Sequence, residues 1–570
     1  MSRLYLNRRE LLLSAIGAIS FTGGCGPRNQ ASLLKSSGAS TSLTPSDPPW
    51  FEDRTLQSGI TFQLGHLPHP SPLNILQTIG AGCALFDFDG DGHLDLLLIG
   101  QIGTRTPSCA LYHNNGDGTF ADITQGSGLE KPGFYLGCAI GDFDNDGRPD
   151  ILLTGYGVLK LFRNVGNGKF EDISKDAGLS SPSPTSWHTS AIFFDFNRDG
   201  HVDFYVGRYV IFNSKTIQLC NYGKYKSSCG PIFYDPDFGS LYHNDGKGHF
   251  TDVTHELGLD NAHGKCLGVA MADVNGDGWP DLYLANDEMP GDLLINEKGR
   301  AFRNEGLLRG VALNGAGEMQ GGMGVDFGDY DNDGLLDLFV ATFEGEPDSL
   351  YHATRSGIFE YASINAGIDQ ATRNMVGFGT KFIDINNNGW LDIVIANGHI
   401  HDNEDLLDKF NHYPQPMQLF MNQGGHLFME MSQHAGPAFT TPMVGRGLAI
   451  GDINNDGLLD IVATDLEGRP RLLINQTPRA GNWLRLTLEG RTSNRMALGA
   501  YVTLTAAGQT WTRQCTTGGS FFSASDPRIH FGLGSVKEVE KVEVLWPSGK
   551  KTVVHSPPIN KDIKVVESDE

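Results

Sequence analysis

The chain has 570 residues, a formal net charge of −24 at pH 7 and 73 glycines. The acidic excess excludes the basic groove or stripe that nucleic-acid binding requires, and it argues against adsorption to anionic lipid headgroups. Because glycine is common in tight turns, its abundance predicts many short strands.

The chain begins with the layout of an export signal, predicted over residues 1–25. Arg3, Arg8 and Arg9 precede an apolar stretch that is too short to span a bilayer as a helix. The small residues before Cys25 resemble a lipoprotein cleavage site with Cys25 lipidated, and the Arg8-Arg9 pair resembles a twin-arginine signal. We therefore expect export to the periplasm, the outer membrane or the cell surface. The route of export and the lipid anchor stay open.

Residues 26–48 are rich in Ser, Thr, Gly and Pro and predict a flexible tether. After it, a nine-residue pattern, D-x-[DN]-x-[DN]-G-x-x-D, recurs seven times. A second pattern, an aromatic residue followed by Asp and then Ser or Thr, alternates with the first, also in seven copies, some of them degenerate.

Each repeat predicts about four short antiparallel strands. Apolar runs precede and follow each acidic pattern, as in residues 82–86 and 95–99, and a third run leads into an Asn-Gly or Asp-Gly turn. Residues 49–480 therefore predict an all-β fold, a seven-bladed β-propeller, because ring closure removes exposed edge strands. A β-solenoid is the alternative, but its repeats are usually shorter.

The acidic patterns are candidate calcium loops. Calcium takes six to eight oxygen ligands. Side chains one, three, five and nine of each loop can turn inward, residue seven can offer its carbonyl oxygen, and the glycine at six permits the bend. Ordinary turns also use Asp, Asn and Gly, but they do not explain four oxygen-bearing side chains at fixed spacing in seven copies. The expected ligands of up to seven Ca²⁺ ions are Asp87, Asp89, Asp91, His93 and Asp95; Asp142, Asp144, Asp146, Arg148 and Asp150; Asp195, Asn197, Asp199, His201 and Asp203; Asp273, Asn275, Asp277, Trp279 and Asp281; Asp329, Asp331, Asp333, Leu335 and Asp337; Asp384, Asn386, Asn388, Trp390 and Asp392; and Asp452, Asn454, Asp456, Leu458 and Asp460.

The seven loops are expected to differ in affinity, because calcium affinity falls as charged ligands are lost. The loops that begin at Asp87, Asp142 and Asp329 carry four carboxylates each. The loop at Asp384 carries two, so it is predicted to bind most weakly. Since the carboxylates repel one another without a cation, bound calcium should stabilise the fold.

Two repeats contain insertions, at about residues 209–238 and 398–416. The first holds Cys220 and Cys229, the best candidates for a disulfide in an exported protein. The second holds a His- and acid-rich set for which a solvated loop is favoured over a further metal site: His399, His401, Asp402, Glu404 and Asp405.

Other reactive side chains have plainer interpretations. Cys83 and Cys138 lie at equivalent positions in apolar strands and predict buried core thiols. His188 lies close to Ser190 before the third acidic loop, where a structural role is expected rather than catalysis. The glycines of residues 315–324 do not form the GxGxxG pattern of a phosphate-binding loop.

Residues 481–567 predict a second, smaller β-domain. Alternating apolar and polar residues at 502–505 and 539–544 predict strands, with Gly-rich breaks between them. We expect a small sandwich or barrel docked on the propeller.

The nine-residue loops resemble the FG-GAP/VCBS repeats of integrin-like propellers. The C-terminal part resembles an ASPIC/UnbV domain, and the matching residues are 482–486, 493–495, 499–500, 518–520, 530–534 and 546–549. With residues 285–290 and 396–399, the chain resembles a bacterial member of the cartilage acidic protein family. The resemblance implies a seven-bladed propeller, calcium loops, an extracytoplasmic location and a role in binding or adhesion. It implies no known reaction.

The sequence as a whole favours a binding module over an enzyme. We expect a monomer that binds a protein or a glycan outside the cytoplasm, has no nucleic-acid partner and contacts a membrane only through an N-terminal lipid anchor. The alternative is a propeller enzyme, a hydrolase or a lyase, that acts on an extracellular polymer. Converging His, Asp and Arg side chains in the channel would favour that alternative.

Overall fold

The structure, a computed structural model, describes residues 48–64, 71–100, 108–179 and 183–568. The predicted export signal with Cys25, and all of the predicted tether except Pro48, lie outside these residues. Residues Pro48–Glu570 form one compact unit, and the description below concerns that unit. Within the described residues, every helix is too short or too polar to cross a bilayer.

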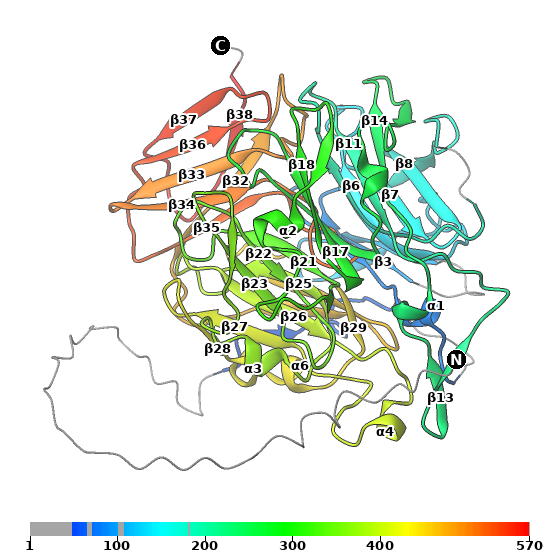
Figure 1. Cartoon of the computed structure of the whole chain (residues 1–570). Helices are drawn as coiled ribbons and strands as arrows, with labels where there is room; N and C mark the ends of the chain where they lie inside the picture. Colours follow the sequence, from blue (N-terminus) through cyan, green and yellow to red (C-terminus); the bar gives the residue numbers. More distant parts are fainter. Residues whose placement is uncertain (1–47, 65–70, 101–107, 180–182, 569–570) are drawn as a thin grey trace, which may run out of the picture. The chain divides into compact units, whose positions relative to one another are not determined.

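Within the described residues, seven antiparallel sheets share a four-stranded plan, and in six of them the four strands are hydrogen-bonded in chain order (Figure 1). Six of them take all four strands from one stretch of chain: β2 (Cys83–Phe86), β3 (Asp95–Ile99), β4 (Cys109–Asn114) and β5 (Phe120–Asp122); β6 (Tyr135–Gly141), β7 (Asp150–Gly155), β8 (Val158–Gly166) and β9 (Lys169–Asp172); β10 (His188–Phe194), β11 (Asp203–Arg208), β14 (Ser240–Asn244) and β15 (Phe250–Asp252); β16 (Cys266–Ala272), β17 (Asp281–Met289), β18 (Asp292–Asn296) and β19 (Phe302–Asn304), with β20 (Gln320–Gly321) paired to β17; β21 (Val325–Gly328), β22 (Asp337–Val340), β23 (Ser349–Ala353) and β24 (Phe359–Tyr361); and β25 (Gly377–Ile383), β26 (Asp392–Asn397), β27 (Gln418–Asn422) and β28 (Phe428–Glu430).

The seventh sheet joins the two ends of the repeat region. It contains β29 (Gly445–Gly451), β30 (Asp460–Asp465) and β31 (Arg471–Asn475), and its outer strand is β1 (Phe51–Asp53) from the start of the described chain. Phe51 pairs with Asn475, and Asp53 pairs with Leu473. The first strands of successive sheets pack side by side, and β29 packs against β2, so the row of sheets closes into a ring. The predicted all-β propeller is confirmed.

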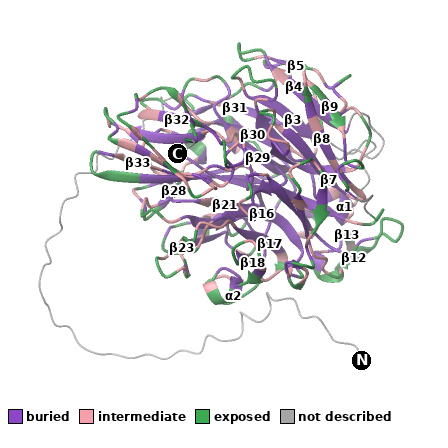
Figure 2. Cartoon of the chain, turned by 90° about the horizontal axis from the view of Figure 1, so that it is seen from above, coloured by how far each residue is buried: buried purple, intermediate pink, exposed green. Residues whose placement is uncertain are grey.

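The acidic loops occupy one place in every sheet, between the first strand and the second. The ninth residue of each loop is the first residue of the second strand, as where Asp95 pairs with Phe86. In the first sheet, β2 and β3 are buried along their whole length, because neighbouring sheets cover both faces (Figure 2). The fourth strand is only partly covered, with Phe120 buried and Asp122 exposed.

The C-terminal part adds two sheets that face each other as a sandwich. One contains β32 (Asn482–Glu489), β35 (Ile529–Gly534) and β38 (Asp562–Val566), and the other contains β33 (Tyr501–Ala506), β34 (Gln509–Gln514), β36 (Lys541–Leu545) and β37 (Lys551–His555). Leu486, Val502, Leu504, Val544 and Trp546 belong to the apolar core that holds the sheets together. This core continues into the propeller through Phe143 and Phe193, among others, so the sandwich is docked on the ring.

A segment of the C-terminal part, residues 516–526, runs through the centre of the ring. It hydrogen-bonds to the first strands of five sheets. Its backbone forms β-bridges from Ala524 to Ala84 on β2 and from Ser520 to Val325 on β21. Three side-chain hydrogen bonds join it to β6, β10 and β29: Thr517 to the carbonyl oxygen of Ile140 (2.7 Å), the Phe522 N–H to Ser190 (3.1 Å), and the Ile450 N–H to Ser525 (3.1 Å). This channel segment therefore fills the space that the first strands enclose.

Two glycines of the ring make room for the channel segment. A Cβ atom at Gly82 would lie 2.1 Å from the carbonyl oxygen of Phe522, and one at Gly447 would lie 2.5 Å from Oγ of Ser523. Both contacts are far shorter than van der Waals distances, so any larger residue at either glycine would push the segment out of the channel.

The remaining elements are short and lie in the connections and insertions. They are α1 (Ile75–Thr78), α2 (Gly306–Arg309), α3 (Asp369–Thr372), α4 (Glu404–Leu407), α5 (Ser432–Ala435), α6 (Pro437–Thr440), η2 (Pro231–Phe233), η3 (Leu259–Asn261), and the hairpin of β12 (Leu219–Tyr222) and β13 (Tyr225–Ser228).

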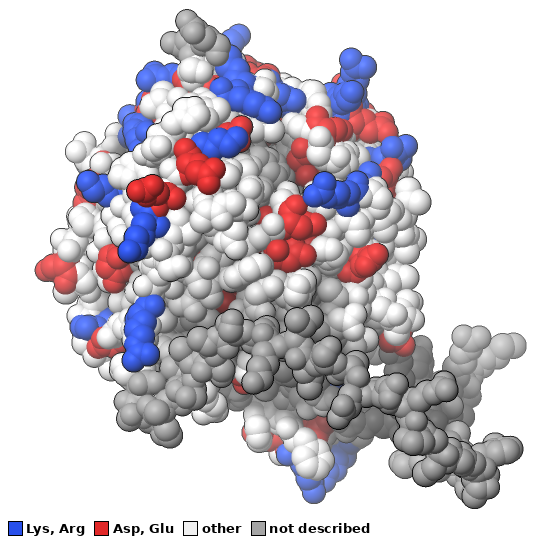
Figure 3. All heavy atoms as spheres, turned by 90° about the vertical axis from the view of Figure 1, so that its left-hand side faces the viewer, with Lys and Arg blue, Asp and Glu red and all other residues white. Residues whose placement is uncertain are grey.

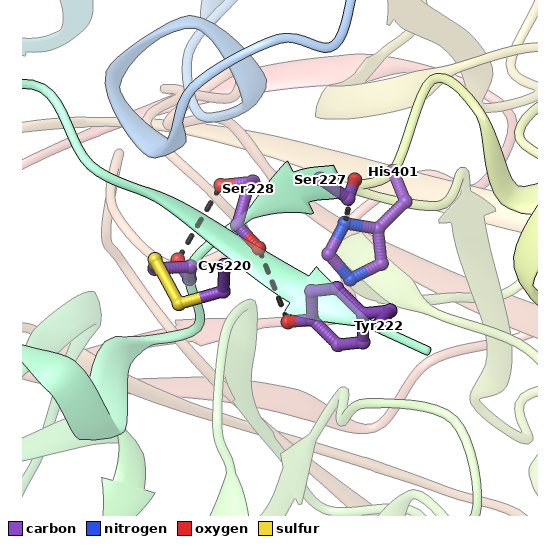
Figure 4. Close-up of a disulfide and its surroundings, with 6 residues drawn as sticks. Cys220, Tyr222, Ser227, Ser228 and His401 are labelled. Atoms are coloured by element: carbon purple, nitrogen blue, oxygen red, sulfur yellow. Dashed lines mark hydrogen bonds between the residues drawn. A yellow bond between two sulfur atoms is a disulfide. The ribbon is translucent and has the colours of Figure 1, made fainter. Parts of the chain in front are cut away.

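The hairpin of the first insertion carries the disulfide between Cys220 and Cys229 (Figure 4). It rests on the second insertion, because Oγ of Ser227 lies 2.8 Å from Nδ1 of His401 and 2.8 Å from Oδ1 of Asn403. The two insertions, far apart in sequence, therefore meet.

Candidate metal centres

The seven acidic loops have nearly the same hydrogen-bond geometry. In each, the carboxylate of the first Asp accepts the N–H of the sixth residue, a glycine, at 2.7 to 3.2 Å. The side-chain oxygen of the fifth residue accepts the N–H of the seventh at 2.8 to 3.0 Å. The side-chain oxygens at positions one and five therefore fix the backbone of the loop in a tight bend around them.

The fourth residue explains why the loops favour Gly and Asn there. In all seven loops it has a left-handed backbone with φ between 56° and 77°, which glycine and asparagine adopt at the least cost: Gly90, Asn145, Arg198, Gly276, Asn332, Asn387 and Asn455. Arg198 is the exception to that preference. Its Nε donates to the carbonyl oxygen of Pro547 in the C-terminal sandwich at 2.6 Å.

The ninth Asp of each loop is buried and uses both of its oxygens. One accepts the N–H of the second loop residue at 2.8 to 3.2 Å, and the other accepts an N–H of the third strand at 2.7 or 2.8 Å. Burial, with a smaller contribution from neighbouring loop carboxylates, raises the pKa of Asp95 to about 8 and that of Asp150 to about 9. The ninth Asp thus clasps the loop to its sheet, and a nearby cation would favour its ionised form.

The side chains fit a cation best in the loops that carry four carboxylates. Ligand atoms of Asp87, Asp89 and Asp91 lie within 4.8 Å of one another, and so do those of the corresponding set Asp142, Asp144 and Asp146. Oδ1 of Asp144 and Oδ1 of Asp329 are buried without a hydrogen-bond partner. A buried carboxylate oxygen without a donor is costly, so these oxygens favour a bound cation. Several acidic clusters could therefore bind a metal ion.

The repeats and the C-terminal part both match known protein families. The FG-GAP-like repeat model matches residues 87–153, 142–206, 232–284, 329–395 and 384–463, which together include all seven loops. The chain belongs to the FG-GAP-like repeat family. Residues 490–570 match the ASPIC and UnbV domain, so both predicted resemblances are confirmed.

The FG-GAP chain is also similar to curated proteins of animals. Cartilage acidic protein 1 of Homo sapiens is 28% identical over 338 residues, which cover 50% of this chain and 50% of the relative. Its counterpart in Mus musculus is 27% identical over 338 residues, covering 50% and 51%. The chain therefore spans about half the length of the curated relatives it matches.

Solved structures similar to the FG-GAP chain have low sequence identity to it. An Agrocybe aegerita lectin that recognises non-reducing terminal N-acetylglucosamine is 16% identical, with a TM-score of 0.39 over 68% of this chain and 86% of the lectin. YCF48 bound to D1 peptide is 10% identical, with a TM-score of 0.40 over 72% and 96%. Rhamnogalacturonan lyase YesW is 13% identical, with a TM-score of 0.35 over 70% and 72%.

The C-terminal sandwich places arginines at three FG-GAP loops. Nη1 of Arg485 lies 2.6 Å from Oδ2 of Asp452, with both side chains buried. Arg513 is buried near Asp329 and Asp384. Burial raises the pKa of both carboxyl groups, and the positive charge of Arg513 offsets part of that rise. These cations were not predicted from the sequence, because they belong to a different domain from the loops that they contact.

Histidines of the third strand lie beside three FG-GAP loops and were also missed. Nδ1 of His113 is 3.2 Å from Asp95, Nδ1 of His243 is 3.0 Å from Asp203, and Nδ1 of His352 is 3.2 Å from Asp337. The signal was present in the sequence, since each follows Leu-Tyr at 111–112, 241–242 and 350–351.

The other residues singled out from the sequence occupy structural positions. His188 donates to the carbonyl oxygen of Val158 (3.1 Å), and Ser190 donates to that of Leu267 (2.6 Å), so the two are engaged separately. Burial lowers the pKa of His188 to about 4 and raises that of the Cys83 thiol to about 12. Cys138 is also buried and free.

The His- and acid-rich set of the second insertion divides into separate contacts. Asp402 accepts the N–H of Leu73 (2.9 Å), Asp405 pairs with His412 (2.6 Å), and His401 contacts Ser227. His399 and Glu404 stay together, with 3.4 Å between Nδ1 and Oε2.

Proposed function

We propose that the protein is an exported β-propeller that holds calcium in its FG-GAP loops and serves as a binding module for a protein or a glycan outside the cytoplasm. The observation that carries the calcium assignment is the common loop geometry. The seven loops share their backbone hydrogen bonds, the carboxylates of the loops at Asp87 and Asp142 lie within 4.8 Å of one another, and buried oxygens such as Oδ1 of Asp144 lack a donor. The expected ligands are all oxygens, which suits calcium.

The side chains at loop positions one, three, five and nine, with the carbonyl oxygen of position seven, would hold each ion. Calcium would supply the positive charge that lets the clustered carboxylates stay ionised. The chain's own residues define the cage, because the hydrogen bonds of the first and ninth Asp fix the loop before an ion enters. Like the loop at Asp384, the loop at Asp452 should bind calcium weakly, because Arg485 competes with the ion for Asp452.

The filled channel supports a binding role over a catalytic one. Propeller enzymes can use the central channel as the active site, but here residues 516–526 occupy it and hydrogen-bond to the strands around it. Surface charge fits the proposed partners, because on the face seen in Figure 3 basic side chains are interspersed with acidic ones and form no continuous stripe.

Export is proposed from the N-terminal sequence alone. Arg8-Arg9, the apolar stretch and Cys25 support export and lipid attachment. Metabolic labelling with a radioactive fatty acid would test the anchor. Labelled wild-type protein with unlabelled Cys25→Ser would support it, and equal labelling of both would contradict it.

The calcium assignment is tested on the purified protein by calorimetry and thermal unfolding. We expect calcium uptake at several sites and a large fall in melting temperature in excess EDTA. One loop filled at a free calcium concentration of 100 times its Kd adds about 2.7 kcal/mol to the stability. No calcium uptake, together with an unchanged melting temperature in EDTA, would overturn the assignment.

The binding role is tested by screening protein and glycan arrays with calcium and with chelator, beside assays against extracellular polymers. We expect calcium-dependent capture of a protein or glycan and no turnover of polymers. Reproducible polymer cleavage would favour the hydrolase or lyase alternative.

A further inference from the structure

A cluster of two glutamates and a histidine lies away from the FG-GAP loops. His399 follows β26, Glu404 begins α4, and Glu344 lies in the connection between β22 and β23. In Figure 1, α4 and β13 lie at the lower edge, whereas the strands of the C-terminal sandwich, which cover the FG-GAP loops, lie at the upper left. The cluster is therefore not part of any calcium loop.

The three side chains have the spacing of ligands rather than of hydrogen-bond partners. Nε2 of His399 is 3.6 Å from Oε2 of Glu344, and Nδ1 is 3.4 Å from Oε2 of Glu404. Hydrogen bonds between nitrogen and oxygen are typically 2.7–3.2 Å. Two ligands that each lie about 2.1 Å from one metal ion, at tetrahedral or wider angles, are about 3.4–3.7 Å apart. One ligand atom from each of the three residues lies within 4.8 Å of the others.

A second observation is independent of the spacing. The His399 side chain is 2% exposed, and its Nε2 has no hydrogen-bond partner. A buried ring nitrogen without a partner is costly, and carboxylates beside it favour a cation at that point. Glu344 faces this nitrogen, and Glu404, which is 5% exposed, lies beside the other ring nitrogen, so two carboxylates flank the imidazole with little water to screen them.

Neighbouring groups fix the ring of His399. Arg446 donates hydrogen bonds to the carbonyl oxygens of Gly398 and His399, both at 3.0 Å, and so fixes the backbone at His399. In these contacts its guanidinium group faces carbonyl oxygens. Phe343 packs against the imidazole with ring centroids 5.5 Å apart. A fixed ring is what a metal ligand needs.

We propose that Glu344, His399 and Glu404 hold a divalent first-row transition-metal ion such as Zn²⁺ or Mn²⁺, with Nε2 of His399 as its nitrogen ligand. With Nε2 bound to the metal, the imidazole proton lies on Nδ1, so the hydrogen bond that Nδ1 accepts from the N–H of His401 (3.1 Å) has to break when the ion binds. One imidazole with two carboxylates suits these ions, whereas calcium takes oxygen ligands.

Such an ion would tie three segments together. Glu344 belongs to a connection of the fifth sheet, and His399 and Glu404 belong to the second insertion. That insertion in turn holds the disulfide hairpin, because His401 contacts Ser227 (Figure 4). Asn403 contacts the same hydroxyl group. Metal binding would therefore make this face of the propeller rigid independently of the calcium loops.

Cobalt(II) titration of the full protein in saturating calcium tests the site. Calcium occupies the oxygen loops, so the visible absorption of cobalt reports a site with a nitrogen ligand. We expect one cobalt ion per chain, displaced by Zn²⁺, and an affinity loss of about tenfold or more in His399→Gln and Glu404→Gln. The matched control is His412→Gln, because His412 lies in the same insertion, is 67% exposed and pairs with Asp405.

Each outcome decides the proposal. The proposal would be overturned if His399→Gln bound cobalt as tightly as the wild type. It would also be overturned if the wild-type protein took up calcium but no cobalt, because the cluster would then be only a histidine between two glutamates. If His399→Gln fails to fold, Glu344→Gln replaces it, since Glu344, at 29% exposed, is the most exposed of the three side chains. Unchanged cobalt affinity in that variant would also overturn the proposal.

Discussion

The first and seventh FG-GAP loops have nearly the same sequence pattern but different surroundings. In the first, Asp89 and Asp91 are exposed, and Asp87 is half-buried. In the seventh, Asp452 is buried against Arg485, and a Cβ atom at Gly457 would lie 2.1 Å from the Trp483 ring. One loop faces solvent, and the other supports the C-terminal sandwich.

This difference shows that one loop motif can serve two purposes. Where solvent reaches the carboxylates, we expect a cation from solution to relieve their mutual repulsion. Where the sandwich covers them, an arginine supplies part of the positive charge. We therefore expect the covered loops to bind calcium more weakly than the open ones, and three predictions test that expectation.

The largest effect is expected from Arg485→Ala. Removing one partner of a buried ion pair leaves Asp452 uncompensated and costs about 3–5 kcal/mol. We expect a lower free energy of unfolding without calcium, and a smaller loss with calcium, because the ion can then neutralise Asp452. Chemical denaturation in EDTA and in calcium measures both values.

The control for this experiment is Arg491→Ala, since Arg491 is 51% exposed and pairs with Glu489 at the surface. It should change the stability little. A loss in Arg485→Ala that is equal with and without calcium would show that the arginine does not compete with the ion.

A smaller effect is expected from Asp91→Asn in the first loop. Loss of one charged ligand should weaken calcium there by about tenfold, or about 1.4 kcal/mol. The matched change Asp456→Asn in the seventh loop should alter the calorimetric titration less, because that loop already binds weakly. Equal changes in both variants would remove the distinction between the two loops.

The smallest effect concerns pH. Burial raises the pKa of Asp95 to about 8 and of Asp150 to about 9 in the calcium-free fold, above the unfolded value of about 3.9. A raised folded pKa gives stability that is complete below pH of about 3.9 and is lost as pH rises through 8 to 9. Calcium keeps these groups ionised, so the difference in melting temperature between calcium and EDTA should grow from pH 5 to pH 8.

Asp150→Asn is the control for the pH experiment, because asparagine cannot ionise and should flatten the pH dependence. Calorimetric scans across this range provide the measurement. A calcium effect that is constant with pH would contradict the assignment of the ninth Asp as a group that needs a cation.

Much of the fold was predictable because each repeat carries local signals. The loop bend at Gly92, the turn before Phe120 and the apolar runs on either side of the loop specify strands and turns at short range. The ninth Asp was also found, since its spacing repeats. The hydrogen bond by which the ninth Asp holds the third strand was not predicted. In the first loop it joins Asp95 to the N–H of Asn114, 19 residues further along the chain.

The sequence by itself determined the repeat plan, the acidic loops, the presence of a second β-domain and the family, because each rests on spacing within one repeat or one domain. Only the tertiary structure decided which loops meet an arginine, what fills the channel, and which of the insertion's acidic residues face His399. Those contacts join residues from distant parts of the chain, and charge and burial at such sites depend on neighbours that no local pattern specifies.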